Sequence, residues 1–203
     1  SIVDSQSTRS QGGRWRLMNE VSCGCLTIFF RHARRQEIPP ERLVNGTGYP
    51  LAHLSRHAAR IDWSAFVRFI GNAAQIWSMR ELEVIGREFR GAPVAPVAAL
   101  RRLFYSPREI YRDFLRPAGG GATLVSCIRP AVVELDEQQL VIDLELDAGY
   151  EYCSEFFHVV RGALASFPRP LGLPFAEVAL TLTPRGARSV SYTHLRAHET
   201  VLD

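Results

Sequence analysis

The spacing of apolar residues changes once along this chain, and that change constrains the fold more than any single motif. Before Gly119-Gly120-Gly121, apolar residues recur three or four positions apart, as on the buried face of a helix. Between Leu140 and Leu146 they recur at every second position, as in a strand with one face in the core. The sequence therefore predicts a helical part at 18–117 and a sheet part at 122–189, with the triple glycine as a flexible connector.

The helical part carries recognisable helix-start signals. Asp62 is a good N-cap for the apolar face that runs from Trp63 to Trp77. Ser78 with Glu81, and Ser106 with Glu109, have the spacing of a capping box. We expect helices over 19–36, 50–57, 62–77, 79–90, 94–105 and 106–116, and a short one that begins at 40.

The sheet part has a different order of elements. Alternation and turn residues predict strands over 123–135, 140–146 and 177–183 and a fourth strand that starts at Ala187, with a helix over 154–167 in the middle. Helices that precede antiparallel hairpins are typical of an α+β domain. The predicted fold is therefore α+β, with N-terminal helices followed by a β-β-α-β-β antiparallel unit whose last strand is truncated.

Composition excludes several function classes. All 24 basic residues are arginine, so the chain has no lysine for a phosphate-binding loop or a Schiff base. A net charge of +3 is too small to indicate binding to nucleic acid or to an anionic membrane surface, and no apolar run reaches the roughly 18 residues of a membrane span. The four cysteines lack metal-ligand spacing and fit buried thiols of a reducing cytoplasm. We therefore expect a cytoplasmic protein.

The strongest candidate site lies where the 140–146 strand leads into the 154–167 helix. There we expect an apolar ligand pocket between helix and sheet, bordered by Cys127, Tyr152, Cys153 and Phe156. The same cluster is also compatible with plain core packing. We predict no catalytic residue, no metal ligand and no cofactor, and keep haem as the alternative. Helical spacing groups His158 with Glu155 and Arg161 on the solvent face, which argues against His158 as the haem ligand.

Both ends of the chain differ from the middle. Residues 1–17 are polar and aperiodic, which predicts a disordered leader. Residues 190–200 resemble, residue for residue, one reading frame through a transposon-based sequencing adapter. Segments of this kind are excluded from fold reasoning. We therefore expect one input domain over 18–189 and a non-native tail over 190–203, as in a metagenomic gene fragment.

Four stretches, at 35–43, 59–66, 106–112 and 155–164, together resemble the N-terminal input regions of bacterial signalling proteins. The order strand–strand–helix–strand–strand is similar to that of 4-vinyl-reductase-like and haem-NO-binding-like ligand domains. The resemblance implies a sensory module of signal transduction that binds a small apolar ligand or a protein partner. It also implies a following output domain, such as the histidine kinase of a two-component system, and a homodimer formed through that parent protein.

An enzyme of unrecognised type, with a site near Tyr150–Phe157, is the rival hypothesis. A pocket lined only by apolar and aromatic groups favours the sensory module. A convergent pair of buried polar groups favours the enzyme.

Overall fold

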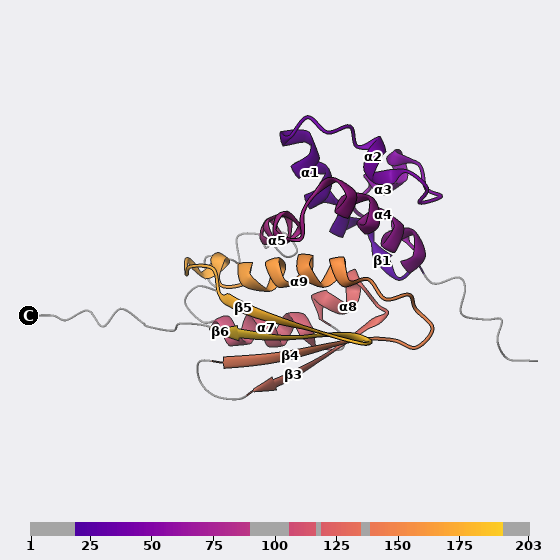
Figure 1. Ribbon diagram of the computed structural model, residues 1–203. Helices are drawn as coiled ribbons and strands as arrows, with labels where there is room; N and C mark the ends of the chain where they lie inside the picture. Colours follow the sequence, from indigo (N-terminus) through magenta and orange to yellow (C-terminus); the bar gives the residue numbers. More distant parts are fainter. Residues whose placement is uncertain (1–18, 90–105, 117–118, 135–138, 193–203) are drawn as a thin grey trace, which may run out of the picture.

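A computed structural model describes residues 19–89, 106–116, 119–134 and 139–192 (Figure 1). The elements of the helical part are β1 (Val21–Ser22), η1 (Cys23–Leu26), α1 (Thr27–Arg35), α2 (Glu41–Val44), α3 (Leu51–Leu54), β2 (Arg60–Ile61), α4 (Trp63–Ile76), α5 (Met79–Arg87) and α7 (Pro107–Leu115). Those of the sheet part are α8 (Gly120–Leu124), β3 (Ile128–Glu134), β4 (Gln139–Leu146), α9 (Ser154–Ser166), η2 (Arg169–Leu171), β5 (Glu177–Thr183) and β6 (Gly186–Tyr192).

The predicted helix starts at Asp62, Ser78 and Ser106 are confirmed. The Asp62 carboxylate accepts a hydrogen bond from the Ala65 N–H at 2.8 Å, and both serines form complete capping boxes. The helix predicted over 19–36 is shorter, because Val21 and Ser22 pair instead with Arg60–Ile61 in a two-stranded sheet. The helix predicted over 94–105 lies outside the described residues.

The chain is α+β, as predicted. The four-stranded sheet is antiparallel, with the strand order β3-β4-β6-β5, and α9 joins its two hairpins. The strand predicted over 123–135 was wrong at its start, because α8 occupies Gly120–Leu124 and β3 begins at Ile128. The triple glycine is part of this packing. A Cβ atom at Gly119 would lie 2.4 Å from the Asp113 carbonyl oxygen, so only glycine lets the chain approach α7 this closely.

The last strand, β6, runs to Tyr192, in full register with β5 from Gly186 onward. The natural sequence was predicted to end near Ser189, and alternation allows Val190 and Tyr192 to extend the hairpin by chance. Ser191 is fully buried on the core face, where its hydroxyl lies 3.0 Å from the Tyr111 hydroxyl. Alternation along the strand and this one polar partner explain why the extra residues fit. The adapter origin of the string that starts at Val190 stays a prediction.

Helix α9 is the middle layer of the molecule. In Figure 1 it runs between the sheet and the helices α1 to α5. Phe157 and Leu164 are buried, and the Tyr111 hydroxyl of α7 donates a 2.7 Å hydrogen bond to the Leu164 carbonyl oxygen. On the sheet side, Arg161 Nε donates to the Val178 carbonyl oxygen at 2.7 Å. A change in the position of α9 would therefore alter its contacts with both the helical part and the sheet part.

Two glycines let α5 and α9 touch backbone to backbone. A Cβ atom at Gly86 would lie 2.0 Å from the Val159 carbonyl oxygen, and one at Gly162 would lie 2.0 Å from the Glu83 carbonyl oxygen. The carboxylate of Glu83 also accepts from Arg161 Nη1 at 2.7 Å and lies 3.1 Å from His158 Nδ1. His158 is therefore half-buried against α5, and the prediction that it faces solvent was wrong because α5 packs on that side.

Within the described ranges, none of the helices combines the length and apolar character that crossing a membrane requires.

Candidate functional site

An apolar cavity of about 120 Å³ lies where the helical part, α9 and the sheet meet. None of its lining residues, all in the described part of the chain, has a charged or hydroxyl side chain. They are Cys25, Ile28, Phe29, Phe66, Phe89, Phe114, Leu115, Gly121, Leu124, Val125, Ile128, Pro130, Leu144, Phe156, Val159, Val160, Ala163, Leu164 and Phe167. Such a site recognises shape and apolar surface, and it offers no group for acid–base chemistry.

One stripe of α9 forms a wall along the cavity. The α9 residues that line it recur at helical spacing from Phe156 to Phe167, the residue that follows the helix. At about 1.5 Å per residue, that stripe is roughly 16 Å long.

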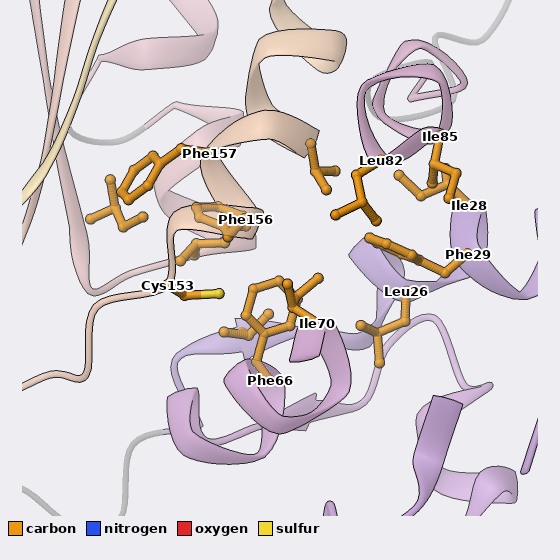
Figure 2. Packing of buried hydrophobic residues seen from close by; sticks show 14 of the residues in the cluster. Leu26, Ile28, Phe29, Phe66, Ile70, Leu82, Ile85, Cys153, Phe156 and Phe157 are labelled. Carbon is orange, nitrogen blue, oxygen red and sulfur yellow. The ribbon is translucent and has the colours of Figure 1, made fainter. Parts of the chain in front are cut away.

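Aromatic rings enclose both ends of the stripe. At one end Phe156 packs against Phe66 (5.4 Å between ring centroids) and Trp63 (5.6 Å). At the other end Phe114 packs edge-on against Phe167 (4.8 Å). Figure 2 shows side chains of α1, α4, α5 and α9 pointing toward one another around this interior. Edge-to-face packing holds the rings, and thus the cavity walls, in a defined geometry.

Cys25 supplies the one sulfur among the lining residues. Burial raises the pKa of its thiol to about 12. A thiol with so high a pKa is a poor nucleophile at neutral pH. Cys25 therefore adds a polarisable wall atom and not a reactive centre.

Of the four residues predicted to border a pocket, Phe156 lines the cavity. Cys127 and Cys153 are buried in the core beside it, and burial raises the pKa of each thiol to about 12. Tyr152 stacks on Phe157, and its hydroxyl donates to the Gly186 carbonyl oxygen at 3.2 Å. These three do not appear among the residues that line the cavity.

The contribution of the helical part to the cavity wall was not predicted from the sequence. Cys25, Ile28 and Phe29 reach it from η1 and α1, and Phe114 and Leu115 from α7. Their apolar periodicity was visible. Which helical face meets the sheet part is a long-range property that periodicity does not encode.

The neighbourhood proposed for an enzyme contains one buried carboxylate, Glu20. Its two oxygens accept from the Trp63 N–H (2.9 Å) and the Tyr150 hydroxyl (3.1 Å). Burial, with the charge of Glu20, raises the pKa of Tyr150 to about 12. Both oxygens hold separate segments together, so the enzyme hypothesis is not favoured.

No protein-family model matches the sequence, and no curated protein sequence matches it. Solved structures do resemble the fold. The Fe(II) unliganded H-NOX protein from K. algicida matches with a TM-score of 0.60 and 11% identity, over 85% of this chain and 96% of that chain. Its A71G mutant matches with a TM-score of 0.60 and 12% identity, over 86% and 98%. The chain has an H-NOX-like fold. At such low identity the likeness concerns the fold alone.

The prediction that the chain carries no cofactor was wrong at the level of the fold. H-NOX proteins are haem-binding domains, so haem is the cofactor that this fold implies. Haem iron is held by histidine, cysteine, methionine or tyrosine. Whether this chain can hold haem therefore depends on which of these residues face the cavity.

The described residues do not fit haem in this cavity. His32, His53, His57 and His158 are the described histidines, and none lines it. His32 lies 3.3 Å from Glu88, and His53 lies 3.0 Å from the Arg60 carbonyl oxygen. The cavity also has no cation for porphyrin carboxylates, and its volume of about 120 Å³ is below the roughly 300–1,000 Å³ of ordinary ligand pockets. Cys25 is the one described lining residue with an iron-ligating atom.

Among the described residues, no cluster of three or more histidine, cysteine, aspartate or glutamate side chains is arranged to hold a metal ion.

Proposed function

We propose that this chain is the sensory input module of a bacterial signal-transduction protein and that its ligand occupies the apolar cavity. The observation that carries the proposal is the position of the cavity, whose walls come from the helical part, α9 and the sheet together. A ligand there contacts elements of both halves at once. Binding shifts a conformational equilibrium only as far as the ligand prefers one arrangement over the other, and a site between packed elements offers such a preference.

The absence of polar lining side chains supports a small apolar ligand over an acid, a sugar or a nucleotide. Buried polar ligand groups would remain without partners there, at a cost of roughly 1–3 kcal/mol each. A protein partner is the second candidate for what the sensory module binds. Such a partner would bind an external surface and not this cavity.

Thermal unfolding of the full chain in the presence of diverse apolar compounds tests this proposal. The panel contains benzene, a long-chain alcohol and haem. At a concentration of about 100 Kd a ligand stabilises by roughly 2.7 kcal/mol, which for a domain of this size raises Tm by about 5–10 °C. We expect at least one compound to do so in the wild type and to lose the effect when Ala163→Phe fills the cavity. If no compound in the panel stabilises the chain, the proposal fails.

We further propose that the parent protein continues into an output domain, of the histidine-kinase or regulator type, and that it works in the cytoplasm as a homodimer. The input domain then covers 18–189, preceded by the 1–17 leader and followed by the non-native 190–203 segment. Genomic sequence downstream of the Ser189 codon tests this directly. A natural homologue that carries the string from Val190 onward would contradict it.

A further inference from the structure

We propose that a second site, a polar cleft along α4, binds a free amino acid, with its carboxylate at Arg68 and its ammonium group at Glu151. The cleft is open to solvent and has a volume of about 480 Å³. This volume lies within the roughly 300–1,000 Å³ of ordinary ligand pockets. The cleft shares no lining residue with the apolar cavity, so this site goes beyond the proposed function and does not depend on it.

One face of α4 forms a long wall of the polar cleft. Its residues follow one another at intervals of four, three and four positions, which places them in one row along the helix. The residues of this row that line the cleft are Ser64, Arg68, Gly71 and Gln75. The other walls come from the turn after α2 and from Glu151, which lies in the connection between β4 and α9.

Gly71 has no packing reason among the described residues. Glycine inside a helix is destabilising relative to alanine, and Gly71 lies well inside α4. Gly86 is explained by the close crossing of α5 and α9, whereas nothing lies within 4 Å of a Cβ atom built at Gly71. The missing side chain keeps the polar cleft open between Arg68 and Gln75. A ligand that approaches the backbone of α4 at this point accounts for the glycine.

Two opposite charges line the polar cleft without neutralising each other. Across the described ranges, neither Arg68 nor Glu151 has an ion-pair partner, and the side-chain amide of Gln75 has no hydrogen-bond partner. A guanidinium group binds a carboxylate through two parallel hydrogen bonds, and a carboxylate accepts hydrogen bonds from an ammonium group. A ligand that carries both charges therefore satisfies both side chains, whereas a ligand with one charge satisfies only one of them.

The connection that carries Glu151 is held against α4. The indole Nε1 of Trp63, the first residue of α4, donates a hydrogen bond to the Glu151 carbonyl oxygen at 2.7 Å. Trp63 also packs edge-on against Phe156 of α9, with 5.6 Å between the ring centroids. Glu151 is thus positioned beside α4 before a ligand binds, which lowers the cost of ordering the site.

Isothermal titration calorimetry of the full chain with each of the common amino acids tests the site. We expect at least one of them to bind with a Kd of about 1 mM or tighter. Its methyl ester lacks the carboxylate charge and its N-acetyl derivative lacks the ammonium charge, so each should bind roughly 10-fold more weakly.

The charge variants assign each end of the ligand. Arg68→Gln and Glu151→Gln should each weaken binding of the amino acid roughly 10-fold. The methyl ester should lose no further affinity in Arg68→Gln, and the N-acetyl derivative none in Glu151→Gln. Arg80→Gln, at an exposed position on α5 outside the polar cleft, is the matched control and should bind like the wild type.

Gly71→Leu separates binding from folding. Leucine is a good helix former and its side chain would enter open space, so the Tm of the free chain should not fall. Binding of the amino acid should nevertheless weaken at least about 10-fold, because the leucine side chain fills the cleft between Arg68 and Gln75.

Three results would overturn the amino-acid site. They are no saturable binding of any amino acid up to about 10 mM, equal affinity for an amino acid and its methyl ester, and a Kd that Gly71→Leu does not change. Stabilisation by the apolar compounds should be the same in the wild type, Arg68→Gln and Gly71→Leu, because these residues do not line the apolar cavity. The amino-acid site and the proposed function can therefore fail independently.

Discussion

Two glycines without side chains, Gly86 and Gly162, determine how closely α5 and α9 pack. At Gly86 and Gly162, α5 and α9 approach so closely that a Cβ atom on either would lie 2.0 Å from a carbonyl oxygen of the other helix. Glycine in a helix normally costs about 1 kcal/mol relative to alanine. The presence of glycine at these two helical positions is therefore explained by the close crossing of α5 and α9 and not by helix propensity.

At the residue scale we predict that Gly86→Ala is destabilising. The added methyl group would push against the Val159 carbonyl oxygen and force α5 away from α9, at a cost of about 1–3 kcal/mol or more. Gly71→Ala on α4 is the control, because nothing lies within 4 Å of its Cβ position, and it should stabilise by about 0.5–1 kcal/mol. Urea unfolding of both variants measures the difference. A neutral Gly86→Ala would mean that the crossing is looser than described.

At the element scale, a cluster around Glu88 fixes α1 against the end of α5. Glu88 accepts hydrogen bonds from Arg31 Nε at 2.9 Å and Arg35 Nη1 at 2.6 Å, and it lies 3.3 Å from His32 Nδ1. Burial acts to raise the pKa of this carboxyl, but the hydrogen bonds from Arg31 and His32 and the charge of Arg35 outweigh it. The pKa of Glu88 is therefore held below its ordinary value of 4.5.

This lowered pKa predicts a pH dependence of stability. A carboxyl whose pKa is lower in the folded state contributes stability above pH 4.5, and the contribution disappears as pH falls through the folded-state pKa. Glu88→Gln should therefore be less stable than the wild type at pH 7, and the difference should shrink toward pH 3. Glu41→Gln, at an exposed position in the first turn of α2, is the control and should show no such change. The measurement is the unfolding free energy of the wild type and of both variants, from urea titrations between pH 3 and pH 7. A difference that stays constant with pH would contradict the assignment.

At the scale of the whole molecule, β6 closes the sheet and connects to α7. It pairs with β4 on one side and β5 on the other, and Ser191 meets Tyr111 in the core. Two of the three residues after Ser189, Val190 and Tyr192, complete the sheet's outer face in register with Val141 and Gln139. The strand thus includes residues whose natural origin the sequence analysis questioned.

Two truncations separate the contribution of β6 from that of the tail. A chain that ends after Tyr192 should unfold at the same Tm as the full chain, since the remaining residues belong to the string predicted to be non-native. A chain that ends after Ser189 loses three register pairs with β4, three with β5 and the Ser191 partner of Tyr111. We expect its Tm to fall by several degrees, because each kcal/mol lost lowers Tm by about 2–4 °C in a domain of this size. Calorimetry of both chains is the measurement. A large loss on removal of 193–203 alone would count against the adapter origin of that segment.

Local sequence determined much of the secondary structure. The capping boxes at Ser78 and Ser106 and the strand Glu177–Thr183 were predictable because their signals lie within a few residues of one another. The α+β class followed from the order of these local elements.

Only the tertiary structure decided the site. The cavity exists because residues of η1, α1, α7, α8 and α9, from distant parts of the chain, surround one space, and none of these contacts is encoded in local periodicity. Phe156 was predicted to border a pocket, whereas the contributions of Phe29 and Phe114 to the cavity wall were not predicted. The glycine crossing of α5 and α9 and the burial of His158 against Glu83 were hidden for the same reason. Spacing along the chain reports which face of an element is apolar, and long-range packing alone reports what that face meets.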